Sequence, residues 1–155
     1  MVSNSKSNIF VIGDLGVTQP QLSQIMQDLG FGPSTQYFSE GKEIVEKMVV
    51  DGTHRSNQLP DVILLDFDLK KDGSQSWLPN IKSHTSISAV PIIVFASPED
   101  EDQSGICYAE GAGGFLTKTS DPTILKGQIE GVLNFWLQSS VKRSGFNRGY
   151  WQRPQ

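Results

Sequence analysis

The stretch "DVILLDFDLKKDG" (residues 61–73) runs from aliphatic residues into two aspartates one residue apart, Asp66 and Asp68. A continuous apolar run of this length is typical of a strand that is covered on both faces of a parallel sheet. Acidic residues at its end either mark the point where the chain reaches solvent or form a site for chemistry at the sheet edge. The remaining sequence has to decide between these two interpretations.

Hydrophobic runs alternate with segments of helical periodicity along the chain. In the segment 18–30, four apolar residues recur at the spacing of one helix face, with Pro20 near the start and Gly30 after the end. The apolar runs between such segments are continuous, as in buried strands. The pattern predicts strands at 9–13, 35–39, 61–66, 91–97 and 114–117, and helices at 18–30, 40–50, 74–83, 97–113 and 122–139.

Single residues predict three details of these helices. Pro79 lies inside the segment 74–83 and weakens the helix prediction there, because an interior proline removes a donor and clashes with the preceding turn. Ser97 is expected to cap the next helix, with the acidic residues 99–102 in its solvated first turn. In the last helix the residues expected in the core are Ile124, Leu125, Ile129, Val132, Leu133 and Trp136.

Five strand–helix units predict an α/β fold, a doubly wound five-stranded parallel sheet with helices on both faces. A chain of 155 residues is the size of one domain. We expect an N-terminal extension at 1–7, the folded domain at 8–139 and a basic, aromatic C-terminal tail at 140–155.

Composition limits the class of protein. The single cysteine, Cys107, excludes an internal disulfide and is expected to be a small buried residue. No apolar run approaches the roughly 20 residues that span a bilayer, and "MVSNSKSNIF" at the start lacks the apolar stretch of a secretory signal. These features predict a cytoplasmic protein with no membrane contact. The net charge of −4 is divided unevenly, because residues 142–155 hold four basic and no acidic residues.

Charged side chains follow three of the predicted strands. Asp14 comes after the first, Asp66 ends the third and Lys118 comes after the fifth. Ligands of such sheets gather at the carboxyl ends of the strands, so these side chains are expected to converge. Two carboxylates supply the hard oxygen ligands that Mg²⁺ prefers, and a carboxylate becomes a nucleophile toward phosphoryl groups once cations neutralise the phosphoryl oxygens. Taken singly, each aspartate is more often a helix cap and the lysine a surface charge.

With these residues in place, the sequence resembles the receiver domain of two-component response regulators over about residues 8–138. Four motifs carry the resemblance: "FVIGD" (10–14), "PDVILLD" (60–66), "VPIIVFAS" (90–97) and "GAGGFLTK" (111–118). The resemblance implies the flavodoxin-like strand order 2-1-3-4-5. It also implies a signalling domain with no enzymatic activity beyond autodephosphorylation.

Carried over to this sequence, the resemblance makes Asp66 the phosphoacceptor and Lys118 the cation that contacts the phosphate. Asp14 and Asp66 are then Mg²⁺ ligands, and Asp68 is a third ligand through its backbone carbonyl.

Several positions depart from the receiver pattern. Gly13 stands where the family has its first acidic residue, so one carboxylate that positions metal-bound water is missing. Ala96 stands at the switch position and offers no hydroxyl to the phosphoryl group. Ser97 follows it but points to the other face of the strand and cannot simply replace it. Phe115 fills the aromatic switch position, where a plain core role is equally consistent.

Within the receivers, the sequence looks most like the single-domain response regulators of cyanobacterial phytochromes. The basis is the long polar link before the third strand, "TKTS" (117–120) and "NFWLQ" (134–138). This resemblance implies a histidine kinase, of the phytochrome type, as phosphodonor. It also implies a homodimer formed through the last helix, the fifth strand and the C-terminal tail.

Other interpretations remain open. Gly13 and Ala96 are also consistent with a degenerate receiver that acts as a phosphorylation-independent interaction module. The pair Asp66 and Asp68 resembles the nucleophile motif of haloacid dehalogenase-like phosphatases, but those enzymes need further acids on another strand. The cations and aromatic residues of the tail can contact nucleic acid, yet four charges beside an acidic body favour packing on a partner subunit instead.

Overall fold

The computed structural model describes residues 7–40, 43–44, 59–68, 77–83 and 87–138. They form one five-stranded parallel sheet with the strand order β2-β1-β3-β4-β5. This is the predicted doubly wound architecture and order. The strands are β1 (Ile9–Ile12), β2 (Thr35–Phe38), β3 (Val62–Phe67), β4 (Ile92–Ala96) and β5 (Gly114–Thr117).

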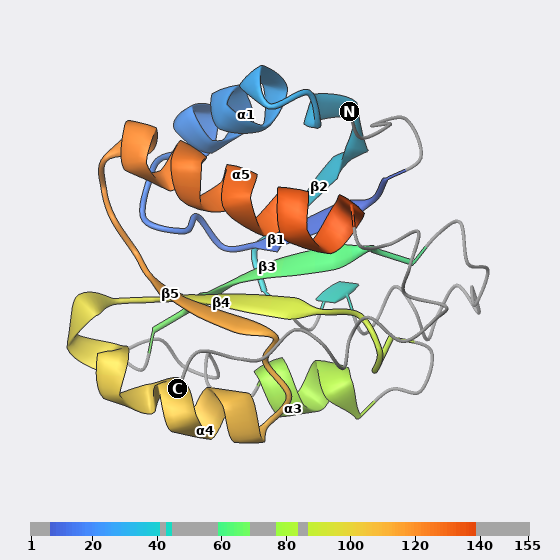
Figure 1. Ribbon diagram of the computed structural model, residues 1–155, viewed down its shortest axis with the longest axis vertical. Helices are drawn as coiled ribbons and strands as arrows, with labels where there is room; N and C mark the ends of the chain where they lie inside the picture. Colours follow the sequence, from blue (N-terminus) through green and yellow to red (C-terminus); the bar gives the residue numbers. More distant parts are fainter. Residues whose placement is uncertain (1–6, 41–42, 45–58, 69–76, 84–86, 139–155) are drawn as a thin grey trace.

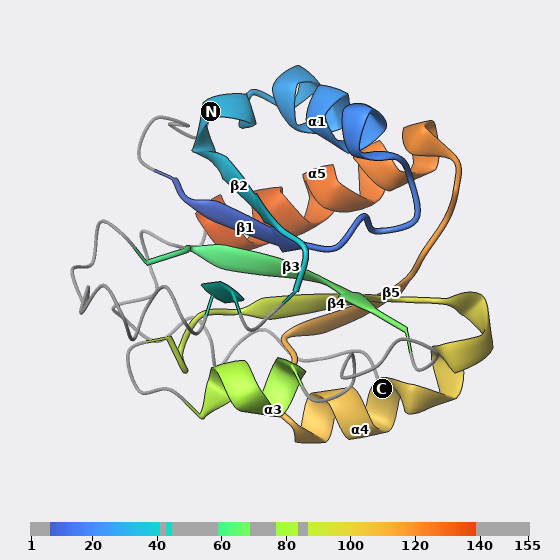
Figure 2. The same ribbon diagram turned by 180° about the vertical axis from the view of Figure 1, so that it is seen from behind.

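Helices cover both faces of the sheet, as Figures 1 and 2 show from opposite sides. One face carries α1 (Gln19–Asp28) and α5 (Pro122–Gln138). The other carries α3 (Trp77–Lys82), the 3-10 helix η5 (Pro98–Gln103) and α4 (Ser104–Ala109). A short 3-10 helix, η2 (Gly32–Ser34), leads into β2. Within the described residues, no helix has the length and apolarity needed to cross a bilayer.

The core has two layers because alternate residues of each strand point to opposite faces. In β4, Ile93 and Phe95 pack with α1 and α5, whereas Val94 and Ala96 pack with the residues of α3 and α4. The central strands β1, β3 and β4 are buried along their whole length. Continuous burial explains their unbroken apolar sequences and leaves the strand ends as the places for polar chemistry.

The strand predictions are close, with shifts of one residue. Gly13 leaves β1 with a backbone φ of +86°, and β3 continues one residue past Asp66 to Phe67. The helix predicted at 18–30 is α1, which begins after its N-cap Thr18 and ends before Gly30, whose φ is +88°. Of the helix predicted at 40–50, the described part contains residue 40, which is not helical, and residues 43–44, which are.

Other helix predictions need correction. The segment 97–113 is a 3-10 helix followed by α4 rather than one α-helix, and Ser97 sits at the N-cap position without a side-chain capping bond. Of the helix predicted at 74–83, the described residues 77–82 form α3, which contains Pro79, whereas residues 74–76 lie outside the described part. Ile124 is 53% exposed and was wrongly expected in the core, although Leu125 beside it is fully buried.

Thr18 sets the start of α1 through a capping box. Its side chain accepts a hydrogen bond from the Gln21 amide at 3.2 Å, and the Gln21 side chain accepts one from the Thr18 amide at 3.0 Å. We expect Thr18→Ala to lower the free energy of unfolding by about 1 kcal/mol, because a backbone donor loses its acceptor. Thr18→Ser keeps the oxygen and should retain most of the stability. Urea denaturation of both variants measures this. A Thr18→Ala variant as stable as Thr18→Ser would contradict the capping role.

Candidate functional site

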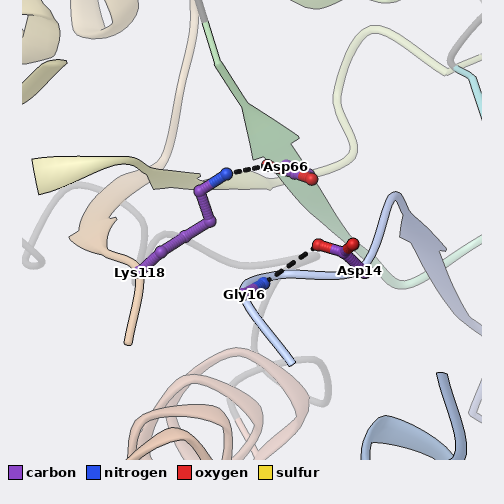
Figure 3. A network of polar contacts seen from close by, with 4 residues as sticks. All are labelled: Asp14, Gly16, Asp66 and Lys118. Atoms are coloured by element: carbon purple, nitrogen blue, oxygen red, sulfur yellow. Dashed lines mark hydrogen bonds and ion pairs between the residues drawn. The ribbon is translucent and has the colours of Figure 1, made fainter. Parts of the chain in front are cut away.

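Asp66 lies near the carboxyl end of β3, with only 6% of the residue exposed. Lys118 directly follows β5, and its ammonium is 2.5 Å from Oδ1 of Asp66. The Asp66 side chain is 3% exposed and the Lys118 side chain 12%. The Lys118 amide also donates to the Ala96 carbonyl oxygen at 2.7 Å, which fixes the start of the loop after β5 against the end of β4. Figure 3 shows the lysine reaching across to the aspartate. The site therefore contains a buried carboxylate that is already paired with a cation.

Gly13 packs its backbone directly against Asp66. A Cβ atom built on Gly13 would lie 2.4 Å from the Cβ of Asp66 and 2.8 Å from its Oδ2. The φ of +86° is in the left-handed region that side chains rarely adopt, and the Gly13 amide donates to the Phe38 carbonyl oxygen at 2.8 Å. The position that lacks the family's first acid thus also lacks room for any side chain in this conformation.

Asp14 reaches the same edge through the tight loop between β1 and α1. Its Oδ1 accepts a hydrogen bond from the Gly16 amide at 3.1 Å, and the residue is exposed (Figure 3). Leu15 adopts a φ of 59° while its side chain is fully buried. A Cβ on Gly16 would lie 2.7 Å from the Thr119 carbonyl oxygen, so this loop packs closely against the segment that follows Lys118.

The donor set at this edge fits a magnesium ion, with one carboxylate fewer than in the receiver pattern. Asp14 and Asp66 supply two carboxylates, and Asp68 follows β3 directly and is half-buried. Among the described residues, no cluster of three or more His, Cys, Asp or Glu side chains is placed to hold a metal. Mg²⁺ is commonly bound through one or two carboxylates and keeps several waters, so the reduced set remains compatible with it.

The switch positions lie on the face of the sheet covered by α3 and α4. Ala96 is fully buried and pairs in register with Thr117, while Phe115 packs partly buried against the same cluster. The Thr117 hydroxyl donates to Oε2 of Glu101 in η5 at 2.9 Å. This bond connects β5 to the start of the α4 region one residue before Lys118.

Sequence reasoning missed the contact between Thr117 and Glu101. Glu101 was interpreted as part of a solvated helix start, and nothing local marks a bond across 16 residues. Cys107, in contrast, is the buried apolar residue that the sequence suggests, and burial raises the pKa of its thiol to about 11. It stays a neutral thiol at physiological pH and takes no part in the site.

A model of the response regulator receiver domain matches residues 9–130, and the chain belongs to this family. Family membership makes it a receiver domain of a response regulator, the class of domain used in two-component signalling. Asp121, three residues after Lys118, accepts a hydrogen bond from the Thr123 amide at 2.9 Å at the start of α5.

The relatives include phytochrome-associated regulators. The chain is 21% identical over 137 residues to the response regulator Rcp1 of Synechocystis sp., a match that covers 88% of this chain and 93% of Rcp1. The phosphorylated cyanobacterial phytochrome response regulator RcpA superposes with a TM-score of 0.68 at 23% identity, covering 86% and 95% of the two chains. The Mn²⁺-bound form of Rcp1 gives a TM-score of 0.65 at 19% identity, covering 85% and 96%. At these identities the structural likeness establishes the fold.

The close contact at Gly13 predicts that restoring the family's acid will not restore a tighter metal site. We expect Gly13→Asp to lower the free energy of unfolding by about 1–3 kcal/mol, because the new Cβ meets Asp66 and the φ is strained. Its Mg²⁺ affinity should not rise. Gly13→Ala is the matched control, with the same steric change and no added charge. An aspartate variant as stable as the natural protein that binds Mg²⁺ more tightly would contradict this account.

The buried ion pair predicts strong coupling between its two members. Lys118→Met leaves the Asp66 carboxylate buried without its cation and should cost about 3–5 kcal/mol of stability. Combining it with Asp66→Asn removes the unpaired charge, so the double variant should be more stable than Lys118→Met alone. Urea denaturation of the two single variants and the double variant measures the coupling. Additive losses would show that the pair is not energetically linked.

Proposed function

We propose that this receiver accepts a phosphoryl group on Asp66 from a phosphohistidine of a histidine kinase. The observation that carries the proposal is the Lys118 ammonium held against the buried Asp66 carboxylate at the strand ends. A carboxylate oxygen of Asp66 attacks the phosphorus of a phosphohistidine whose other ring nitrogen is protonated. The bond from phosphorus to the imidazole nitrogen breaks, and the imidazole, keeping that proton, leaves as the neutral base. The product is an acyl phosphate on Asp66.

Each residue of the site has a separate task in this proposal. Asp66 is the nucleophile, and its burial limits access of bulk water to the acyl phosphate. Lys118 is near enough to move from the carboxylate to a phosphoryl oxygen and to neutralise its charge. Asp14, Asp66 and the Asp68 carbonyl are the proposed ligands of Mg²⁺. When bound, that ion supplies charge neutralisation at the phosphoryl oxygens.

Transmission of the signal must differ from a switch based on a hydroxyl at position 96. Ala96 supplies no hydroxyl, and Phe115 is partly buried against the hydrophobic cluster that contains Ala96. The bond from Thr117 to Glu101 instead ties β5 to η5 immediately before Lys118. A shift of Lys118 toward a phosphoryl group would bias this bond and the position of α4, which is a local contact acting on a larger element.

The partners follow from the family and its relatives. The receiver family implies a histidine kinase, and the names of RcpA and Rcp1 support a phytochrome-type kinase for this chain. We further propose a homodimer that forms through α5, β5 and the tail at 140–155. The tail lies outside the described residues.

A phosphorylation-independent interaction module is the second candidate. It is favoured by Gly13, which removes a carboxylate, and by Ala96, which removes the switch hydroxyl. The two candidates differ in one chemical property, the formation of the acyl phosphate.

Incubation with Mg²⁺ and acetyl phosphate separates the candidates. We expect the intact mass to rise by one phosphoryl group and the label to be absent in Asp66→Asn, because this carboxylate is the only proposed nucleophile. Hydroxylamine should remove the label, as expected for an acyl phosphate. No added mass under conditions in which the protein binds Mg²⁺ would favour the interaction module.

A further inference from the structure

An apolar groove of about 370 Å³ runs between α5, β5 and α4. β5 is at the edge of the sheet, with α5 on one side and α4 on the other (Figure 1). Aromatic side chains line much of the groove: Tyr108, Phe115, Phe135 and Trp136. Its volume lies within the range of sites that hold a small ligand or a partner's side chains.

Two glycines of α5, Gly127 and Gly131, open one wall of this groove. A Cβ atom at either position would have no other atom within 4 Å, so neither glycine is needed for packing in the described structure. A glycine inside a helix costs about 0.5–1 kcal/mol relative to alanine. Two glycines spaced one turn apart on the same open face therefore keep the groove clear at the expense of helix stability.

Gln128 adds a polar requirement to the groove. Its Nε2 donates to the Thr117 carbonyl oxygen at 3.3 Å, whereas its Oε1 is shielded from solvent and receives no hydrogen bond from the residues that the structure describes. A buried acceptor without a donor is unfavourable by about 1–3 kcal/mol. An occupant with an apolar body and a single donor, as in tryptophan or tyrosine, fits both features.

We propose that the C-terminal tail of the same chain occupies this groove, with Tyr150 and Trp151 as its anchors. The tail carries four basic and no acidic residues. Residues 1–141 hold the other nine basic residues and all seventeen acidic ones, so the tail and the rest of the chain have opposite net charges. Aromatic anchors flanked by cations thus match an apolar groove on an acidic protein body.

Chain length permits this docking within one molecule. The groove extends back along α5 from Trp136 to Gly127, about 14 Å at the rise of an α-helix. Tyr150 is 12 residues beyond the end of α5 at Gln138, a span of up to about 40 Å when extended. Docking on its own chain closes the face through which the dimer is proposed to form, so the tail must leave the groove before it can contribute to a dimer. The docking does not depend on phosphoryl transfer.

Amide hydrogen exchange of the full chain tests the proposal. At concentrations where sedimentation shows a monomer, we expect the amides of the tail to exchange about tenfold more slowly than in a free synthetic peptide of residues 139–155, corresponding to docking for about nine-tenths of the time. Gly131→Leu fills the groove and should return the tail to the rate of the peptide. Leucine is a better helix former than glycine, so this variant should fold, and a thermal melt checks that it does.

Gly105→Leu is the matched control, because Gly105 is also a helical glycine with open space around its Cβ but lies in α4 and does not line the groove. Its tail should stay protected. Trp151→Ala should speed exchange in the rest of the tail without changing the groove. Three results would each overturn the proposal. The tail could exchange at the rate of the free peptide, its protection could stay unchanged in Gly131→Leu, or its protection could rise with protein concentration.

Discussion

A carboxylate buried at the end of a strand needs a counter-charge, and in this protein Asp66 finds it in Lys118. The two residues are 52 positions apart and are separated by β4. They meet because β3, β4 and β5 run parallel in register, so that all three strands end at the same edge. The chemistry of the site is therefore a consequence of strand order. Any change that shifts the β5 register moves the cation away from the carboxylate.

Gly13 modifies this arrangement without removing it. Its left-handed backbone lets the loop after β1 lie against Asp66, and the same loop carries Asp14 to the edge and packs on the segment after Lys118. The missing carboxylate and the left-handed backbone of this loop therefore occur at the same residue. The buried carboxylate and its cation are both present, which supports the proposed phosphoryl transfer with one proposed metal ligand fewer.

Much of the fold could be predicted from the sequence because the central strands are buried on both faces and read as unbroken apolar runs. The convergence of Asp66 and Lys118 followed from their places after strands of one parallel sheet. The backbone conformation of Gly13 could not be predicted, because the presence of a glycine does not by itself indicate a positive φ or a contact with Asp66, 53 residues further along the chain. Ile124 was misplaced because the helical spacing of α5 does not say which flank of its apolar stripe faces the core.

The central claim is that Asp66 receives a phosphoryl group whose charge Lys118 neutralises. A crystal structure of the protein with Mg²⁺ and beryllofluoride, which imitates the acyl phosphate, tests it most directly. The account predicts beryllofluoride bonded to an Asp66 carboxylate oxygen, with the Lys118 ammonium moved from the carboxylate to a fluorine atom. A complex in which Asp66 stays paired with Lys118 and carries no beryllofluoride at saturating concentrations would contradict it.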